Sequence, residues 1–162
     1  MKKSVKTAGG AMQTAFNTID VVTIQMVHER QLMYGGVRLT SPGQAADAFK
    51  ALVGDPDREI FCVLILDGKN RITSIHQVSQ GSLNQSIVHP RETFKAAILA
   101  NAAAIILAHN HPSGDTTPSR EDKEITQRLK EAGELLGIRV LDHVIIDTET
   151  SNYLSFCDSG LI

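Results

Sequence analysis

Two histidines and an aspartate in the segment HNHPSGDTTPSRED have the types and spacing of metal ligands. His109 and His111 lie two residues apart, so in an extended chain their side chains point to the same side. Asp122 follows eleven residues after His111, and the loop between them is long enough to fold its carboxylate back onto the imidazoles. Two histidines and one carboxylate suit zinc, and three protein ligands with water in the fourth position are typical of a catalytic zinc site. Such a metal lowers the pKa of its bound water to about 7 and polarises a carbonyl group.

A His-x-His pair by itself is weak evidence, because one imidazole can belong to a core while the other caps a helix. The pair is more specific here because Pro112, a Ser-Gly turn and then Ser-x-x-Asp follow it. Ser119 is well placed to cap a helix that carries Asp122 in its first turn. A cap of this kind stabilises a protein by roughly 1 kcal/mol without any part in chemistry.

The elements around this segment are expected to alternate between strands and helices. Periodicity and turn residues predict strands at residues 19–27, 59–66, 71–78, 103–108, 138–146 and 153–156, and helices at 42–53, 89–101 and 120–136. This order predicts an α/β fold, a mixed β-sheet flanked by helices, with residues 1–18 as a disordered tail before a single domain at 19–162. His109 directly follows an expected strand, and in open α/β sheets ligands bind at that end.

Composition excludes several classes of function. The chain has 162 residues, a formal net charge of -2 and no basic stripe, which argues against nucleic-acid binding. Cys62 and Cys157 lie far apart and form no disulfide framework, so a reducing, cytoplasmic location is expected. No apolar stretch reaches the roughly 20 residues of a membrane span, and no secretory signal follows the first lysines.

The metal segment resembles the motif of the JAMM (MPN/JAB) metallohydrolases. Their pattern is His-x-His-Pro, six residues, Ser, two residues and Asp, and His109, His111, Pro112, Ser119 and Asp122 match it position by position. The flanking stretches VHPRETFKAAILANAAAIILAHNHPSGD and LLGIRVLDHVII are similar to the bacterial RadC-like branch of that group, and the likeness runs from residue 41 to the C-terminus.

Asn110 departs from the eukaryotic pattern, which has Ser or Thr there, but Asn is the RadC-like form. The resemblance implies a sheet and helices layered as in the cytidine-deaminase fold. It also implies a zinc ion (Zn2+) held by His109, His111 and Asp122, with Ser119 bonding the zinc-bound water or the oxyanion. The substrate implied is a peptide or protein, cleaved at an amide bond by a metallopeptidase or isopeptidase.

The resemblance further implies a glutamate that acts as general base and then as proton donor. Glu59, at the start of an apolar strand, matches the order of elements in the family, and Glu92 at the start of the HPRE helix is the alternative. His89 is expected to shape the entry of that helix. His143, or its neighbour Asp142, is a candidate to support a ligand imidazole from behind.

Other functions remain possible at this stage. JAMM-like domains also serve as binding modules without catalysis, although this chain keeps the ligands, Ser119 and an acidic residue at Glu59. RadC-like proteins carry a DNA-repair label by name, and full-length members add a helix-hairpin-helix region for which too few residues precede Ser41 here. A zinc nucleoside deaminase is excluded, because that chemistry needs His-x-Glu and a Pro-Cys-x-x-Cys pair. The sequence predicts neither the oligomeric state nor the identity of the substrate.

Overall fold

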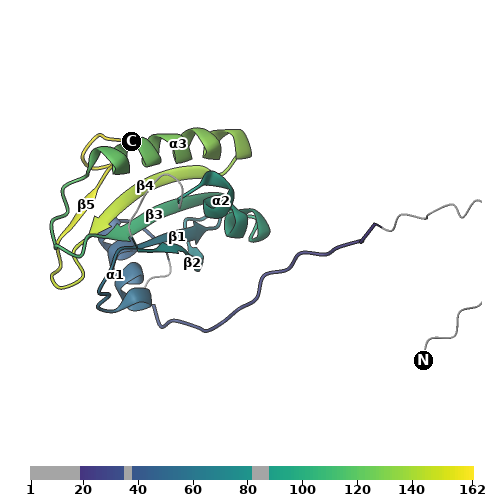
Figure 1. Ribbon diagram of the computed structural model, residues 1–162, viewed down its shortest axis with the longest axis horizontal. Helices are drawn as coiled ribbons and strands as arrows, with labels where there is room; N and C mark the ends of the chain where they lie inside the picture. The colour runs from purple at the N-terminus through teal and green to yellow at the C-terminus, as the bar shows by residue number, and fades with distance from the viewer. Residues whose placement is uncertain (1–18, 35–37, 82–87) are drawn as a thin grey trace, which may run out of the picture.

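Two apolar runs of the sequence form the two central strands of one five-stranded sheet. The computed structural model describes residues 19–34, 38–81 and 88–162 (Figure 1). The elements are α1 (Pro42–Val53), β1 (Ile60–Leu66), β2 (Ile72–Gln80), α2 (Pro90–Leu99), β3 (Ala104–Asn110), α3 (Arg120–Leu136), β4 (Arg139–Ile146) and β5 (Tyr153–Ser155). The strand order is β2-β1-β3-β4-β5, with β3 and β4 parallel and the other pairs antiparallel. The predicted α/β fold with a mixed sheet and flanking helices is confirmed.

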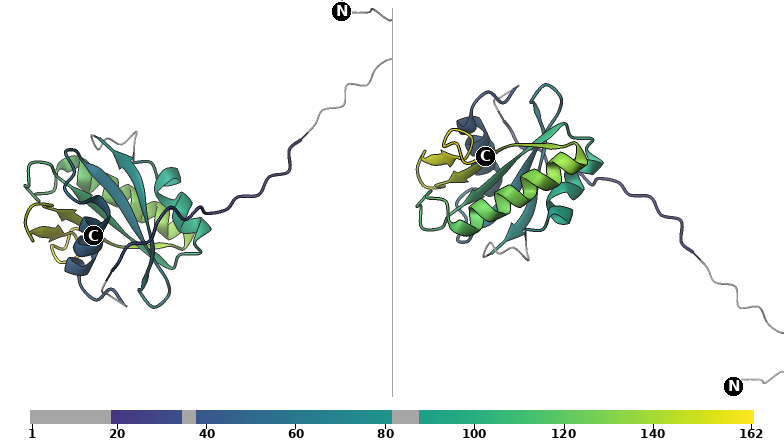
Figure 2. Two further views of the ribbon diagram at one scale, coloured as in Figure 1. Left: turned by 90° about the horizontal axis from the view of Figure 1, so that it is seen from below. Right: turned by 90° about the horizontal axis from the view of Figure 1, so that it is seen from above.

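Strands β1 and β3 are buried on both faces, which explains why β1 is apolar throughout and β3 is apolar up to His109. Because side chains alternate along a strand, Cys62 and Leu64 pack with α1, whereas Phe61 and Val63 pack on the opposite side with α2 and α3. Figure 2 shows this layering, with α1 on one side of the sheet and α3 lying across the other. His109 shares the strand face of Leu107, so it points toward the layer that contains α3.

Helix α3 begins and ends where its sequence predicts. The Ser119 side chain accepts from the backbone N–H of Asp122, and the Asp122 side chain accepts from the backbone N–H of Ser119, which completes a capping box. Gly137 ends the helix with φ of 70°, a left-handed conformation that glycine adopts without steric cost. The start of α3, and with it Asp122, is therefore fixed by local chemistry.

The strand expected at residues 19–27 is wrong, and the strands expected at 71–78 and 103–108 each continue two residues further, to Gln80 and Asn110. Residues 19–27 form no strand: the described stretch 19–34 is extended but unpaired, with side chains such as Val21 fully exposed. Alternating apolar residues make a strand only when another strand pairs with them. Strand β3 continues beyond Ala108 to Asn110, because β1 and β4 pair with it on both sides up to His109 and Asn110. The expected tail at 1–18 and most of the expected loop at 81–85 lie outside the described residues.

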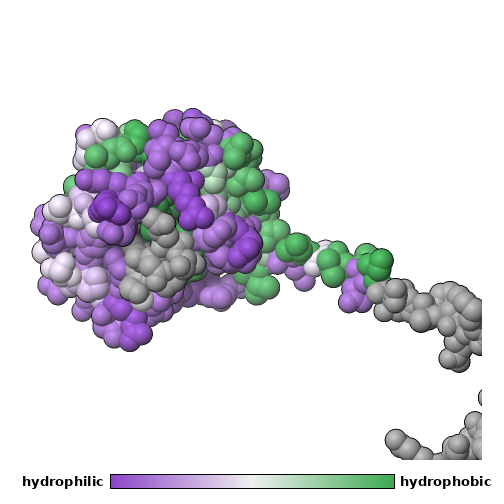
Figure 3. Space-filling view, turned by 45° about the horizontal axis from the view of Figure 1, so that its top comes forward, coloured by the Kyte–Doolittle hydropathy of each residue, from purple (hydrophilic) through white to green (hydrophobic). Residues whose placement is uncertain are grey.

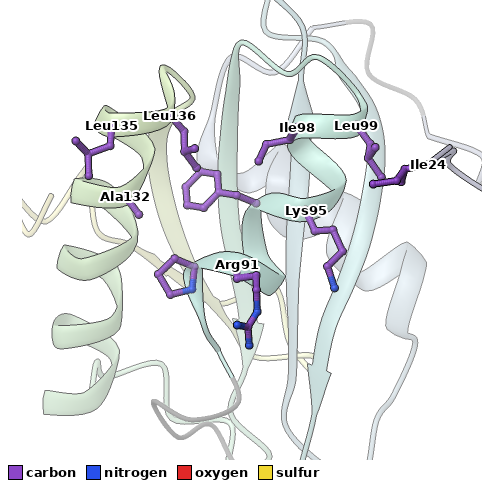
Figure 4. Close-up of a pocket in the computed structure, with 10 residues that line it drawn as sticks. Ile24, Arg91, Lys95, Ile98, Leu99, Ala132, Leu135 and Leu136 are labelled. Atoms are coloured by element: carbon purple, nitrogen blue, oxygen red, sulfur yellow. The ribbon is translucent and has the colours of Figure 1, made fainter. Parts of the chain in front are cut away.

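Hydrophobic side chains also gather at the surface beside the extended segment (Figure 3). A groove of about 610 Å³ lies between α2 and α3, with Ile98 on one side, Leu135 and Leu136 on the other, and Ile24 at its edge (Figure 4). None of the candidate metal ligands lines this groove. In the described part of the chain, no helix has both the length and the apolar character needed to cross a membrane.

Candidate metal centre

The three residues predicted as metal ligands converge on one point. The Nε2 atoms of His109 and His111 lie 3.0 Å apart. Asp122 places Oδ1 3.3 Å from Nε2 of His109 and Oδ2 3.6 Å from Nε2 of His111. The side chains of His109 and Asp122 are buried, and that of His111 is 17% exposed, so the cluster is open to solvent on the side of His111. A ligand set open on one side matches a catalytic zinc site better than a structural one.

Each of these side chains is positioned by a different local feature. His109 lies within β3, opposite Phe61 of β1 and Ile145 of β4. His111 follows just beyond the strand, and its Nδ1 lies 2.5 Å from the backbone carbonyl oxygen of Asp115. A carbonyl oxygen only accepts, so Nδ1 of His111 carries the proton and donates it. In the neutral ring, Nε2 then faces the cluster with a free lone pair.

Glu59 reaches the same cluster from the residue before β1. Its Oε1 lies 3.9 Å from Nε2 of His111, and the ligand atoms of Glu59, His109 and His111 all lie within 4.8 Å of one another. Asn110 holds the backbone on both sides of Glu59: its Oδ1 accepts from the N–H of Ile60 at 2.9 Å, and its Nδ2 donates to the carbonyl of Arg58 at 3.2 Å. Asn110 is fully buried, so its amide has a positional role.

Glu92, the alternative general base, lies in a different environment. It is in the first turn of α2 and forms ion pairs with Lys95 at 2.5 Å and with Arg91 at 3.3 Å. These hydrogen bonds, that of Lys95 first, lower the pKa of Glu92, which keeps the carboxylate charged. The structure therefore groups Glu59, and not Glu92, with the two histidines.

The electrostatics of the cluster favour a cation. The hydrogen bond with Asp122 raises the pKa of His111, against an opposing effect of burial. Burial pushes the pKa of Asp122 upward, but its close contacts with the imidazoles of His109 and His111 outweigh burial and hold that pKa well below the usual range. The carboxylate thus stays ionised, and two ring nitrogens face each other beside it. A positive charge, either a proton or a metal ion, stabilises this arrangement.

A buried pair of residues behind His109 completes the site. Nδ1 of His109 lies 2.8 Å from Nε2 of His143, whose Nδ1 lies 2.6 Å from the hydroxyl of Thr126. His143 was a candidate supporting residue from the sequence, whereas Thr126 was missed. A signal for it exists, because Thr126 lies four residues after Asp122 on α3 and so shares its helix face.

The remaining candidates lie away from the cluster. His89 caps α2, with its Nδ1 accepting from the backbone N–H of Arg91 at 3.1 Å, as expected for the entry of that helix. Asp142 does not support an imidazole. Its carboxylate instead accepts from the hydroxyl of Ser155 and from the backbone N–H groups of His143 and Cys157.

The amino-acid sequence of this chain is similar to those of known proteins. The model of the RadC-like JAB domain family matches residues 39–161. A UPF0758 protein of Trichlorobacter lovleyi is 61% identical over 125 residues, which cover 77% of this chain and 54% of that protein. A UPF0758 protein of Geobacter sulfurreducens is 50% identical over 159 residues, covering 98% of this chain and 68% of that protein. One from Staphylococcus haemolyticus is 49% identical over 124 residues, covering 76% and 54%.

The chain spans about half the length of several of these relatives, and their shared name states no activity. The family match covers the whole sheet, its three helices and every residue of the candidate metal centre. On this evidence, the chain belongs to the RadC-like JAB domain family.

Proposed function

We propose that this chain is a zinc-dependent hydrolase that cleaves an amide bond in a peptide or protein. The observation that carries the proposal is the convergence of two imidazole Nε2 atoms and one ionised carboxylate, with a second carboxylate within 3.9 Å of His111. Three such ligands and a neighbouring general base form the arrangement of catalytic zinc sites. The match to a JAB domain family supports it.

In this proposal His109, His111 and Asp122 hold the metal. When bound, zinc supplies a Lewis acid that polarises the substrate carbonyl and acidifies water. Glu59 takes a proton from the attacking water at Oε1 and returns it to the leaving nitrogen. Ser119 stabilises the developing oxyanion through its hydroxyl, whose one proton is donated to Asp122 at 2.6 Å in this structure and would turn to the oxyanion as it forms.

We further propose that the enzyme is a peptidase or isopeptidase that works in the cytoplasm. Both cysteines are free thiols, Cys62 in the core and Cys157 at the surface, which suits a reducing compartment. The partly exposed His111 and Glu59 leave the open side of the cluster accessible to a chain as large as a peptide.

Elemental analysis of the purified protein tests the metal site. We expect about one zinc ion per chain, the stoichiometry of a mononuclear site, and we expect His109→Ala and Asp122→Ala to lose it. His89→Ala is the matched control, because His89 caps α2 away from the cluster and its variant should retain zinc. Wild-type protein without bound metal after zinc has been supplied would contradict the proposal.

Hydrolysis of a library of peptide and isopeptide amides tests the chemistry. We expect Glu59→Gln to retain zinc while losing activity by at least the roughly 100-fold typical of a general base. Glu92→Gln is the control, because Glu92 pairs with Lys95 and Arg91 at the surface and its variant should remain active. Unchanged activity in Glu59→Gln would overturn the role of Glu59, and full zinc occupancy without any hydrolysis would indicate a binding module.

A further inference from the structure

We propose that Thr126 and His143 form a directed hydrogen-bond relay that places the proton of His109 on Nδ1 and leaves its Nε2 free to bind metal. His143 and Thr126 are positioning residues in this proposal, since neither touches the substrate or the metal. The inference rests on the proposed function, because only a metal ligand requires a lone pair at Nε2 of His109.

The direction of the relay follows from counting protons, beginning at Thr126. Its hydroxyl oxygen lies 2.6 Å from the backbone carbonyl oxygen of Asp122 and 2.6 Å from Nδ1 of His143. A hydroxyl has one proton to donate, and a carbonyl oxygen has none. Two oxygens at 2.6 Å need a proton between them, so the proton of Thr126 belongs to the contact with Asp122.

The remaining two contacts are then determined. Because the proton of Thr126 is used elsewhere, Nδ1 of His143 must donate to the hydroxyl oxygen. The ring of His143 is 0% exposed and packs against Phe61 and Phe156, an environment that disfavours a charged ring, so its Nε2 is the acceptor of the neutral imidazole. Nδ1 of His109, 2.8 Å away, must therefore carry the proton that Nε2 of His143 accepts. Nε2 of His109 is left without a proton on the side of His111 and Asp122.

The opposite direction is unfavourable at Thr126, where it would leave two oxygens in contact without a proton between them. It would also put the proton of His109 on Nε2, 3.3 Å from Oδ1 of Asp122, where it blocks a metal. His109, Thr126 and His143 are at most 2% exposed, so bulk solvent does not reach these contacts. The ring of His143 stacks on Phe156 at a centroid distance of 4.8 Å and meets Phe61 edge-on at 5.6 Å, so its surroundings are largely apolar.

The relay also links two of the proposed ligands mechanically. It runs from the backbone of Asp122 on α3, through His143 on β4, to His109 on β3. Hydrogen bonds to the outer nitrogen of a ligand histidine fix its orientation and raise its basicity. The relay would thus hold His109 and Asp122 at a constant separation whether or not a metal is bound.

Nitrogen NMR of the histidine rings in metal-free wild-type protein tests the direction without any metal or activity. Long-range proton–nitrogen spectra distinguish a protonated ring nitrogen from a bare one, and we expect both His143 and His109 to be protonated at Nδ1. His143 protonated at Nε2 instead would overturn the relay. Zinc binding is measured separately, so a protein that binds no zinc but shows Nδ1 protonation would refute the proposed function and leave the relay direction intact.

A matched pair of variants tests its effect on the metal. Thr126→Val keeps the side-chain shape but removes the hydroxyl, and Thr126→Ser keeps the hydroxyl. Loss of partners of this kind costs about 10- to 100-fold in metal affinity, so we expect that decrease in zinc affinity for Thr126→Val and near wild-type affinity for Thr126→Ser. Unchanged affinity in Thr126→Val, or an equal loss in Thr126→Ser, would contradict the relay. The wild-type NMR result decides the direction even if a variant fails to fold.

Discussion

Ser119 and Asp122 bind each other through three hydrogen bonds. The carboxylate oxygen Oδ2 of Asp122 accepts from the backbone N–H of Ser119 at 2.8 Å and from its hydroxyl at 2.6 Å. The backbone N–H of Asp122 donates in turn to the hydroxyl oxygen of Ser119 at 3.0 Å. The cap of α3 and a proposed metal ligand are therefore the same group of atoms.

This arrangement predicts that Ser119→Ala has two separable effects. Loss of the cap should lower the free energy of unfolding by about 1 kcal/mol, as for other N-cap serines. Activity should fall by more than the loss of folded protein explains, because Asp122 loses a hydrogen bond and the oxyanion loses a donor. Denaturant titration and amide hydrolysis measure the two effects.

Ser41→Ala is the matched control for Ser119→Ala. Ser41 is the N-cap of α1, but its side chain makes no cap hydrogen bond. The control should therefore change neither stability nor activity appreciably. Equal losses of stability in the two variants would show that the cap hydrogen bond of the Ser119 hydroxyl contributes nothing to stability.

Replacement of Asn110 should displace Glu59 indirectly, through the backbone of its two neighbours. Asn110→Ala leaves the N–H of Ile60 and the carbonyl of Arg58 without their partner, which costs about 1–3 kcal/mol for buried groups. We expect activity to decrease more than zinc affinity, since the two backbone groups that lose their partner flank Glu59, whereas His109, His111 and Asp122 keep their own contacts. Calorimetry and zinc titration check this, with Asn152→Ala, at an exposed position, as the control. A loss of zinc without a change in stability would contradict this role.

The metal-free protein should lose stability as the pH rises. The pKa of His111 is raised above 6.5, first by its hydrogen bond with Asp122, so the native state favours the protonated ring. The resulting stabilisation is complete below the unfolded pKa of about 6.5 and disappears as the pH rises through the folded pKa. The melting temperature of chelator-treated protein, measured against pH, checks this. In His111→Gln, the fall in melting temperature that comes from deprotonation of His111 should be absent. A pH profile identical to that of the wild type would refute this role of His111.

Gly133 on α3 should not tolerate a side chain. A Cβ atom there would collide with the backbone carbonyl oxygen of Ile138 and approach Cζ of Phe94 to 3.2 Å. Alanine is ordinarily the better helix residue by about 1 kcal/mol. Overpacking costs typically 1–3 kcal/mol, so we expect Gly133→Ala to destabilise the protein despite that preference. Glu134→Ala, at the next and exposed position, is the control for thermal unfolding, and a stabilised Gly133→Ala would contradict the packing.

The sequence predicts those parts of the site that depend on local chemistry. The three proposed ligands come together because the end of a strand, a short loop and the capped start of a helix follow one another directly in the sequence. These ligands are His109, His111 and Asp122. Glu59 was assigned only through family resemblance. Its approach to His111 depends on the pairing of β1 with β3, about fifty residues apart, which no local pattern encodes.

The errors have the same physical origin. Residues 19–27 have the alternation of a strand, but alternation cannot show whether a partner strand exists. The end of β3 was placed two residues early because His109 and Asn110 are polar, and only pairing with both neighbours explains why polar residues continue a buried strand. Thr126 was missed because its role depends on a histidine that reaches it from β4.

The register that pairs Phe61 with His109 must be exact for Glu59 to reach the histidines. If β1 slipped by one residue, Glu59 would turn to the opposite face of the sheet, and a slip of two residues would carry it about 7 Å along the strand. Such a misaligned molecule would retain His109, His111 and Asp122, which belong to other elements, and would still capture zinc. The ratio of turnover to bound metal would thus report what fraction of a preparation has matured with its strands correctly aligned.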